Sequence, residues 1–220
     1  MITVGKRGVQ SYASAMDIGA LRLQFHQQHY LRFPDFLDPE ILAFAQSQID
    51  SGQFYQRVHE DIGSNKELCM VGNAGLGALL LLVNDEKLFQ VIQDLTQCAK
   101  IRCFEGRVYR VSAGQGHHDS WHDDIGDHRL VGMSVNLGKN VHIGGMLQIR
   151  ERASGKIVAD VPNACAGSAV IFRLSENLQH RITVVEGGEP KTAFAGWFRA
   201  NSDFLSLLKG RGADNRSVPG

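Results

Sequence analysis

Hydrophobic and polar positions follow different periods in the two halves of the chain. Before residue 100 the apolar residues recur at helical spacing, as at Leu88, Val91, Ile92 and Leu95, which fall at i, i+3, i+4 and i+7. After residue 100, short runs rich in valine, isoleucine and aromatic residues alternate with turns that contain glycine. The pattern predicts helices in the first half and strands in the second.

Residue types at the ends of the periodic segments predict where the helices begin. Asp38 can cap a helix, Pro39 suits its first position, and Glu40 favours the positive end of the helix dipole. Similar signals place another helix from Asn84-Asp85 onward. The expected helices cover 39–50, 18–29 and a segment from residue 84, and a short strand is expected at 30–33.

Seven segments of the second half have the composition and length of strands. Gly144-Gly145, Ala166-Gly167 and Gly187-Gly188 separate several of them as turns or bends. Short strands at this spacing predict a β-sandwich or a barrel. The expected strands are 107–111, 131–137, 146–150, 157–161, 169–172, 180–185 and 192–198.

Length and composition fit one globular domain. The 220 residues include 43% hydrophobic and 21% charged residues, which is ordinary for a folded domain and argues against disorder. We expect a single domain over 1–208, with a helical part at 1–100 and a β core at 101–200. Residues 209–220 are rich in Gly, Arg, Asn and Ser without apolar periodicity, which predicts a flexible tail.

Charge and hydropathy argue against two classes of partner. Lys plus Arg and Asp plus Glu both number 23, so the chain lacks the basic excess on which most nucleic-acid binding depends. No apolar run approaches the roughly 18 residues that span a bilayer, and no apolar stretch follows the charged N-terminus as in a secretory signal. The cysteines form no C-x-x-C pair. We therefore expect a cytoplasmic protein that binds neither nucleic acid nor a membrane.

Two His-x-Asp motifs lie close together and offer metal ligands. Two imidazoles and a carboxylate can hold Fe(II) on one face and leave the opposite positions open. On a strand, residues i and i+2 point to the same side, so His122 and Asp124 would present their ligand atoms together. His117 and Asp119 have the same spacing but opposite parity, so one regular strand would turn only one of the two pairs inward. The loop and strand that follow favour His122 and Asp124.

Several motifs follow one another from residue 109 to residue 198 in an order that is typical of one enzyme family. They are Tyr109, His122-x-Asp124, Gly144-Gly145-Met146-Leu147, Gly167-Ser168-Ala169-Val170-Ile171-Phe172, His180, Lys191 and Gly196-Trp197-Phe198. Over this region the chain resembles the prolyl-4-hydroxylase-like branch of the Fe(II)/2-oxoglutarate-dependent oxygenase superfamily. The helical first half agrees with that family only in its general layout.

The resemblance implies both a fold and a set of cofactors. The fold would be mainly β with flanking helices (α+β): a double-stranded β-helix, or jelly-roll and cupin-like core, with the N-terminal helices packed outside. His122, Asp124 and His180 would bind Fe(II). The co-substrates would be 2-oxoglutarate and O₂, with ascorbate as an optional reductant.

The resemblance also assigns a cation to the co-substrate. Lys191 would hold the far carboxylate of 2-oxoglutarate. It lies one position further from His180 than the family's cation usually does, so the turn at 186–190 needs one extra residue. Arg181 is the rival cation, but as the strand neighbour of His180 it should point to the opposite side.

Other polar residues of the β half have weaker assignments. By resemblance, Tyr109 and Asn136 are expected to reach the co-substrate from neighbouring strands. His118, Asp119 and Trp121 flank the metal motif, where they would either contact substrate or belong to a solvated loop. The remaining histidines belong to no recognisable group and are expected at the surface or in packing; they are His26, His29, His59, His128 and His142.

The expected activity is hydroxylation of an unactivated C–H of an amino acid, a peptidyl side chain or another small metabolite, with succinate and CO₂ as co-products. Halogenation is not expected, because related halogenases lack the carboxylate that Asp124 provides. A cupin-like isomerase or hydrolase with Zn(II) or Mn(II), in which Lys191 would not matter, is the alternative enzyme, and a non-catalytic β-sandwich binding module is the alternative binding protein. Residues 53–70 and loops near His118 are expected to contact the substrate. The sequence indicates neither the identity of this substrate nor the oligomeric state of the protein.

Overall fold

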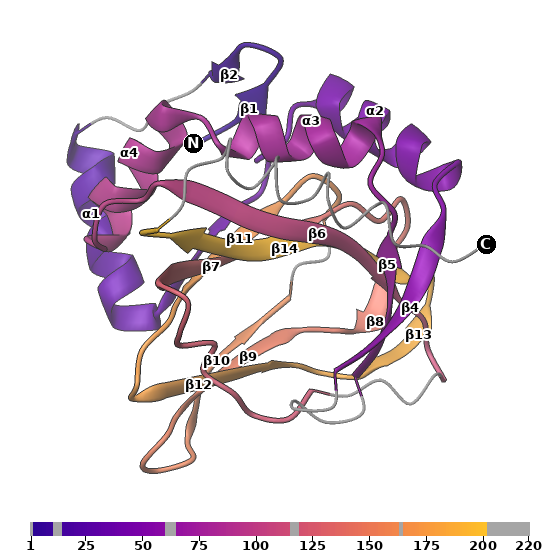
Figure 1. The fold of residues 1–220 in the computed structure, drawn as a ribbon. Helices are drawn as coiled ribbons and strands as arrows, with labels where there is room; N and C mark the ends of the chain where they lie inside the picture. Colours follow the sequence, from indigo (N-terminus) through magenta and orange to yellow (C-terminus); the bar gives the residue numbers. More distant parts are fainter. Residues whose placement is uncertain (1, 11–14, 60–64, 115–118, 163–164, 202–220) are drawn as a thin grey trace.

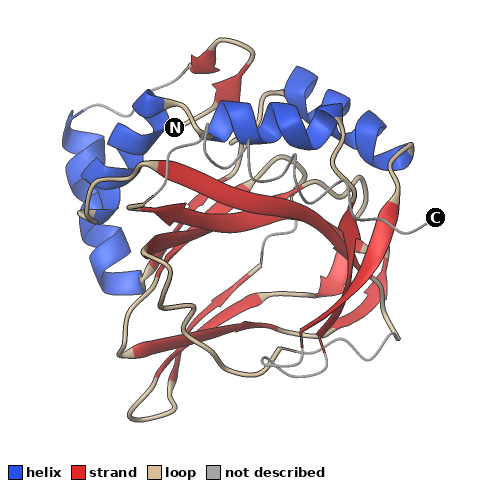
Figure 2. Ribbon diagram, in the orientation of Figure 1, coloured by secondary structure: helices blue, strands red, loops and turns tan. Residues whose placement is uncertain are grey.

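Two facing layers of β-sheet form the centre of the molecule, and helices cover the outer side of one layer (Figures 1 and 2). The computed structural model describes residues 2–10, 15–59, 65–114, 119–162 and 165–201. Within these ranges the helices all precede residue 97, and most strands follow it. The chain is mainly β with flanking helices, as predicted.

The helices lie where capping residues predict most of them. They are α1 (Ala15–Gln28), α2 (Pro39–Asp50), α3 (Ala74–Val83) and α4 (Glu86–Thr96). The side chain of Asp38 accepts a hydrogen bond from the backbone N–H of Ile41 (2.8 Å), and Asp85 caps α4 in the same manner. The three predicted helices are confirmed. The sequence does not predict α3, because its long apolar run has no amphipathic period.

A seven-stranded antiparallel sheet carries most of the core, with the strand order β3-β11-β7-β14-β6-β5-β4. Its strands are β3 (Tyr30–Phe33), β4 (Phe54–His59), β5 (Asn65–Met70), β6 (Cys103–Val111), β7 (Arg129–Asn136), β11 (Ala169–Arg173) and β14 (Lys191–Arg199). Along β14 successive side chains point to opposite faces. Phe194 and Phe198 pack in the core beneath the helices, whereas Ala193 belongs to a small cluster on the inner face.

The second layer lies below the large sheet in Figure 1 and consists of a three-stranded sheet, β10-β9-β12, and a two-stranded sheet, β13-β8. Its strands are β8 (His142–Gly144), β9 (Leu147–Glu151), β10 (Ile157–Val161), β12 (Leu178–Ile182) and β13 (Val185–Gly188). An apolar cluster that includes Leu147, Ile149 and Phe172 joins the two layers. Two facing layers with external helices form the jelly-roll core that the resemblance implies.

Three segments differ from the sequence-based expectation. β1 (Val4–Gly5) and β2 (Gly8–Val9) form a short hairpin, and β4 and β5 form another that extends the large sheet at one edge. The first hundred residues are therefore not only helical. The single strand predicted at 180–185 is two strands, β12 and β13, because the chain leaves one sheet of the second layer and enters the other.

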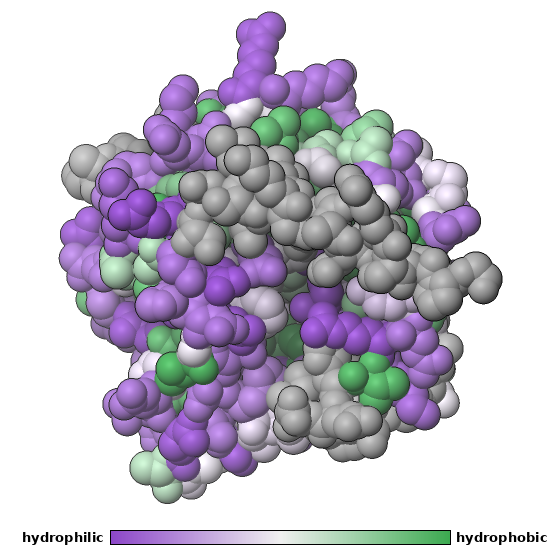
Figure 3. All heavy atoms as spheres, viewed as in Figure 1, coloured by the Kyte–Doolittle hydropathy of each residue, from purple (hydrophilic) through white to green (hydrophobic). Residues whose placement is uncertain are grey.

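Two further predictions concern the surface and the ends of the chain. The tail expected at 209–220 lies outside the described residues. No helix in the described ranges is long and apolar enough to cross a membrane. On the face seen in Figure 3, hydrophobic residues appear as separate groups among hydrophilic ones, the usual appearance of a surface that water covers.

Candidate metal and co-substrate site

His122 and His180 lie opposite each other on neighbouring backbone segments. The backbone N–H of His122 donates to the His180 carbonyl (3.1 Å), and the N–H of His180 donates to the His122 carbonyl (2.7 Å). Directly opposed residues of an antiparallel pair project their side chains to the same side. The two imidazole ring centroids are consequently 4.4 Å apart.

Asp124 reaches this pair by a route that differs from the predicted strand. In the described part of the loop from Asp119 to His128, only His122 forms a β-bridge, and Asp124 adopts a left-handed backbone conformation (φ 55°). Aspartate tolerates that conformation better than most residues. The resulting turn places Asp124 Oδ2 at 3.2 Å from His180 Nε2 and at 3.8 Å from His122 Nε2. The proximity is as predicted, but the strand-parity reason for it is wrong.

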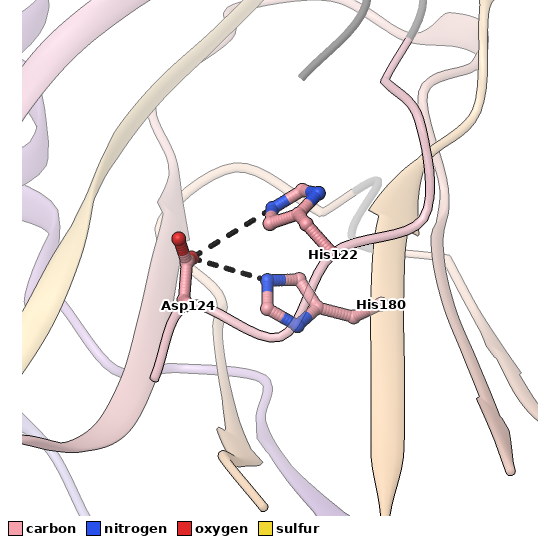
Figure 4. A group of neighbouring side chains, drawn as sticks. All are labelled: His122, Asp124 and His180. Atoms are coloured by element: carbon pink, nitrogen blue, oxygen red, sulfur yellow. Dashed lines mark hydrogen bonds and ion pairs between the residues drawn. The ribbon is translucent and has the colours of Figure 1, made fainter. Parts of the chain in front are cut away.

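The three side chains converge on one point from a loop and a strand (Figure 4). One ligand atom from each residue lies within 4.8 Å of the others. The Nδ1 atom of His122 is 2.8 Å from the Ser120 carbonyl, which can only accept, so Nδ1 carries the proton and Nε2 presents its lone pair. A set of two imidazoles and one carboxylate, with one ring already oriented in this way, fits Fe(II).

Two further residues also hold the Asp124 carboxylate. Arg129 Nη1 donates to its Oδ1 (3.1 Å), and the indole N–H of Trp197 donates to its Oδ2 (2.9 Å). The Arg129 guanidinium in turn lies 3.9 Å from the centroid of the Trp197 ring. Burial alone would raise the pKa of Asp124, but the hydrogen bond and charge of His180, the charge of His122 and the Trp197 bond together hold that pKa at about 2. The carboxyl is therefore ionised, as a metal ligand must be.

His180 is held in the neutral form by its surroundings. The residue is 6% exposed, and its ring lies 4.8 Å from that of Phe172. Burial lowers the pKa of His180 in spite of the neighbouring Asp124 carboxylate. A neutral imidazole is the form that binds metals.

Asp119, of the rival His-x-Asp motif, has a structural contact of its own. It is 7% exposed, and its Oδ2 accepts a hydrogen bond from the backbone N–H of Ile182 (3.1 Å), at the end of β12. Its motif partner, His117, lies outside the described residues. The expectation of a solvated loop is wrong at Asp119, because this buried carboxylate ties the metal loop to the strand that carries His180.

The rival cation Arg181 and its neighbour Trp121 lie away from the three converging side chains. Arg181 Nε donates to Gln148 Oε1 (2.9 Å), and its guanidinium lies 4.5 Å from the Trp121 ring centroid, with Arg150 also over that ring at 4.4 Å. His180 and Arg181 are consecutive on β12, so their side chains alternate as predicted. Neither Arg181 nor Trp121 lines the cavity described below.

Lys191 is a buried cation at the start of β14. It is 3% exposed, its Nζ donates to the Gly145 carbonyl, and it forms no salt bridge with any described residue. Burial lowers the pKa of Lys191 to about 8, although the charge of Asp119 opposes the shift. The pairing of β13 with β8 shifts register between Val185 and Gly187, and this shift overlaps the turn at 186–190 in which the sequence predicts an extra residue.

The other two expected co-substrate residues also face the space between the layers. Tyr109 lies on β6 opposite Ala193, and burial raises its pKa. Asn136 lies on β7, also opposite Ala193, and is 2% exposed. Its Oδ1 accepts from the Gly138 N–H (2.9 Å), whereas its Nδ2 is buried without a hydrogen-bond partner among the described residues.

A cavity of about 530 Å³ opens between the two layers, and the three converging side chains form part of its wall. Near them it is apolar, with Leu147, Phe172 and Ile182 in the lining. Further along β6 it becomes charged, and two ion pairs lie there: Arg107 with Glu67 (2.8 Å), and Arg199 with Glu105. Tyr109 lines this cavity, whereas Lys191 and Asn136 lie beyond its lining.

Sequence reasoning does not find several of these groups. Trp197 was recognised only as part of a motif, and Arg129 not at all, since its role depends on the turn at Asp124. Alternation along β6 was the available signal for Arg107, because it shares a face with Tyr109. His142, expected at the surface or in packing, is buried beside Lys191.

The geometry defines a class of protein. By its fold and its His–Asp–His site it is an oxygenase of the non-haem Fe(II) type that uses 2-oxoglutarate and O₂. Residues 106–199, which carry the whole site, match the model of the 2OG-Fe(II) oxygenase superfamily. The match confirms the resemblance and favours an oxygenase over the isomerase, hydrolase and binding-module alternatives. No match was found among curated protein sequences.

Solved structures share the fold at low sequence identity. A prolyl-4-hydroxylase from Pseudomonas putida matches with a TM-score of 0.62 at 19% identity, over 84% of this chain and 100% of the other. A prolyl hydroxylase from Trichoplax adhaerens, in complex with a hypoxia-inducible factor peptide, matches with a TM-score of 0.61 at 15% identity, over 94% and 98% of the two chains. An oxidoreductase of the 2OG-Fe(II) oxygenase family from Burkholderia pseudomallei gives 0.63 at 13% identity, over 92% and 99%.

Proposed function

We propose that this enzyme hydroxylates an unactivated C–H bond of an amino acid, a peptidyl side chain or another small metabolite, with succinate and CO₂ as co-products. The observation that carries the proposal is the convergence of His122, Asp124 and His180 at a cavity between the two β layers. These three residues are the proposed metal ligands. When bound, Fe(II) with 2-oxoglutarate and O₂ supplies the oxidising power for such a reaction.

The chain's own contribution at the metal is to fix the ligands before the metal binds. Ser120 orients the His122 ring through its carbonyl, and Arg129 and Trp197 donate hydrogen bonds to the Asp124 carboxylate. Such contacts set the tautomer and direction of each ligand, so less reorganisation is needed on binding. Leu147, Phe172 and Ile182 keep the adjoining wall of the cavity apolar and limit the access of water.

At the other end of the site, Lys191 is proposed to bind the far carboxylate of 2-oxoglutarate. A buried ammonium without a salt bridge is unfavourable, and a carboxylate ligand would supply the direct ion pair that Lys191 lacks among the described residues. Tyr109 and Asn136, which face the same space, are the proposed neighbours of the co-substrate. Of the arginines in the lining of the cavity, Arg107 already pairs with Glu67 at 2.8 Å, and Arg129 and Arg199 also pair with carboxylates.

The substrate class and the reaction outcome go beyond the family match. Two of the similar structures are prolyl hydroxylases, one of them with a peptide, and a further structure with a TM-score of 0.60 at 12% identity is an α-ketoglutarate-dependent epimerase, SnoN, from nogalamycin biosynthesis. The charged part of this chain's cavity, with Arg57, Glu67 and Arg107, supports a small polar substrate. Residues 53–70 thus contribute Arg57 and Glu67 to the proposed substrate region.

A spectroscopic titration tests the proposal. Anaerobic addition of Fe(II) and 2-oxoglutarate should produce a weak visible charge-transfer band, and exposure to air with a panel of amino acids and peptides should convert 2-oxoglutarate to succinate in step with a product gain of one oxygen atom. The absence of both the band and 2-oxoglutarate binding would overturn the assignment of the site. A band with substrate turnover but without oxygen incorporation would replace hydroxylation by another oxidation.

A further inference from the structure

His142 is a buried histidine that the metal site does not use. It begins β8, it is 7% exposed, and its Nδ1 has no hydrogen-bond partner among the described residues. A buried polar atom without a partner is unfavourable, and such an atom is often satisfied by a ligand or an ordered water molecule. A ligand or a water molecule beside Nδ1 would satisfy this atom.

His142 lies next to Lys191. A Cβ atom placed on Gly145 would be 2.9 Å from Lys191 Cδ and 3.3 Å from His142 Cδ2, so the two side chains meet at this glycine. Lys191 Nζ also donates to the Gly145 carbonyl. Burial lowers the pKa of His142, and the charge of Lys191 lowers it further, so the imidazole is neutral near pH 7.

A second unpartnered donor faces the same part of the molecule. Asn136 and Lys191 both project from the inner face of the large sheet, because Asn136 is opposite Ala193 and Lys191 is two residues from Ala193 on β14. The Nδ2 atom of Asn136, like the Nδ1 atom of His142, is buried without a hydrogen-bond partner among the described residues. Lys191 supplies a positive charge, which would repel a metal ion. His142 and Asn136 can each donate a hydrogen bond from a neutral N–H group, so the three residues together suit a carboxylate ligand.

We propose that His142 completes the pocket for the far carboxylate of 2-oxoglutarate, by donating a hydrogen bond from Nδ1 next to the ammonium of Lys191. The inference rests on the proposed function, since it needs 2-oxoglutarate as the co-substrate. His142 is here a binding residue that distinguishes a dicarboxylate from a simple 2-oxo acid.

Two ligands that differ in the far carboxylate distinguish a role of His142 in binding that carboxylate from a purely structural role. 2-Oxoglutarate carries the far carboxylate, whereas 2-oxobutanoate has the same chelating 2-oxo acid end without it. Both are titrated anaerobically into the Fe(II)-loaded protein, and the charge-transfer band reports their dissociation constants. His142→Leu should weaken 2-oxoglutarate binding at least fivefold and change 2-oxobutanoate binding less than twofold.

Conservative variants and a matched control keep the test decisive. His142→Asn places an amide close to the position of Nδ1 and should retain most of the preference for 2-oxoglutarate, whereas His142→Gln places its amide near Nε2 and should lose it. His29→Leu is the control, because the Nδ1 of His29 also lacks a partner among the described residues but His29 lies between α1 and β3, and it should leave both affinities unchanged.

The possible failures are distinguishable. If the wild-type protein gives no band with either ligand, the proposed function fails. If the wild type binds 2-oxoglutarate but His142→Leu weakens both ligands equally or neither, the inference about His142 is overturned while the proposed function stands. Should His142→Leu fail to fold, as judged by circular dichroism and Fe(II) binding, the comparison of His142→Asn with His142→Gln decides, and equal preferences in these two variants would overturn the inference.

Discussion

In the cavity wall the Asp124 carboxylate is surrounded by Arg129, Trp197 and the two histidines, whereas Lys191, which lies beyond the lining of the cavity, has among the described residues one hydrogen bond, to the Gly145 carbonyl. Both charges are largely buried, but within the described residues only Asp124 forms salt bridges, whereas the charge of Asp119 acts on Lys191 without a direct ion pair. The pKa of Asp124 is accordingly held at about 2, while burial lowers that of Lys191 to about 8.

The difference between the two ends suggests how the enzyme divides its binding energy. At the metal end the protein has already supplied the hydrogen bonds that orient a ligand, so the site is organised in advance. On the proposed assignment, the buried donors of Lys191, His142 and Asn136 would gain a carboxylate partner only when 2-oxoglutarate binds. Four experiments can break or sharpen this contrast.

The largest effect is expected at the metal end. Asp124→Ala should lower turnover by at least about a thousandfold, because the metal loses its only carboxylate ligand. Succinate formation and Fe(II) binding both measure the effect. Asp123→Ala is a matched control, since Asp123 is the adjacent aspartate but pairs with Arg152 instead of the histidines. Full hydroxylation by Asp124→Ala would shift the assignment to Asp119.

Loss of the hydrogen bond from Trp197 to Asp124 should reduce Fe(II) affinity or turnover less than loss of Asp124 itself. Trp197→Phe removes the indole N–H that donates to Asp124 Oδ2 and should reduce Fe(II) affinity or turnover by roughly tenfold to a hundredfold. Isothermal titration with Fe(II) and steady-state kinetics report the two quantities. Trp121→Phe, on the outer face of the second layer, should leave both within twofold. Equal behaviour of the two variants would show that the metal end is not organised by Trp197.

At the opposite end, Lys191→Met should weaken 2-oxoglutarate binding by at least tenfold, or about 1.4 kcal/mol. The reason is the loss of the buried cation that balances the far carboxylate, and the charge-transfer titration measures it. Lys139→Met removes an exposed lysine that pairs with Asp50 and serves as the control. Unchanged affinity in Lys191→Met would move the cation to another residue, for which Arg107→Met is the next variant.

The smallest effect is a pH dependence of the same binding step. Because burial lowers the pKa of Lys191 to about 8, the free protein loses the required proton as the pH rises through that value, and 2-oxoglutarate affinity should fall. If the complex keeps the proton, the expected fall is about fivefold between about pH 7 and pH 8.7. The residual affinity of Lys191→Met should lack this dependence over the same range. A wild-type affinity that rises with pH would contradict the role of the ammonium.

Much of the fold and part of the site follow from local patterns. Asp38 and Asp85 mark helix starts because their side chains bond to N–H groups only three residues away. The opposite directions of His180 and Arg181 on β12 also follow from local sequence spacing, because successive side chains of a strand point to opposite faces. The hairpin of β4 and β5 was not predicted, and its attachment to the large sheet, through Leu68 and Cys69 opposite β6, is a contact between segments far apart in the chain.

By itself, the sequence determined the helix starts, the series of β strands and the His122-x-Asp124 motif, which depend on residue chemistry and short-range periodicity, and its resemblance to a known family singled out His180 and Lys191. Only the tertiary structure decided that Asp124 reaches the histidines through a left-handed turn, that Asp119 ties the loop to β12, and that His142 lies beside Lys191. These contacts join segments far apart in the chain. They depend on strand register and on the packing of two layers, which no local pattern encodes.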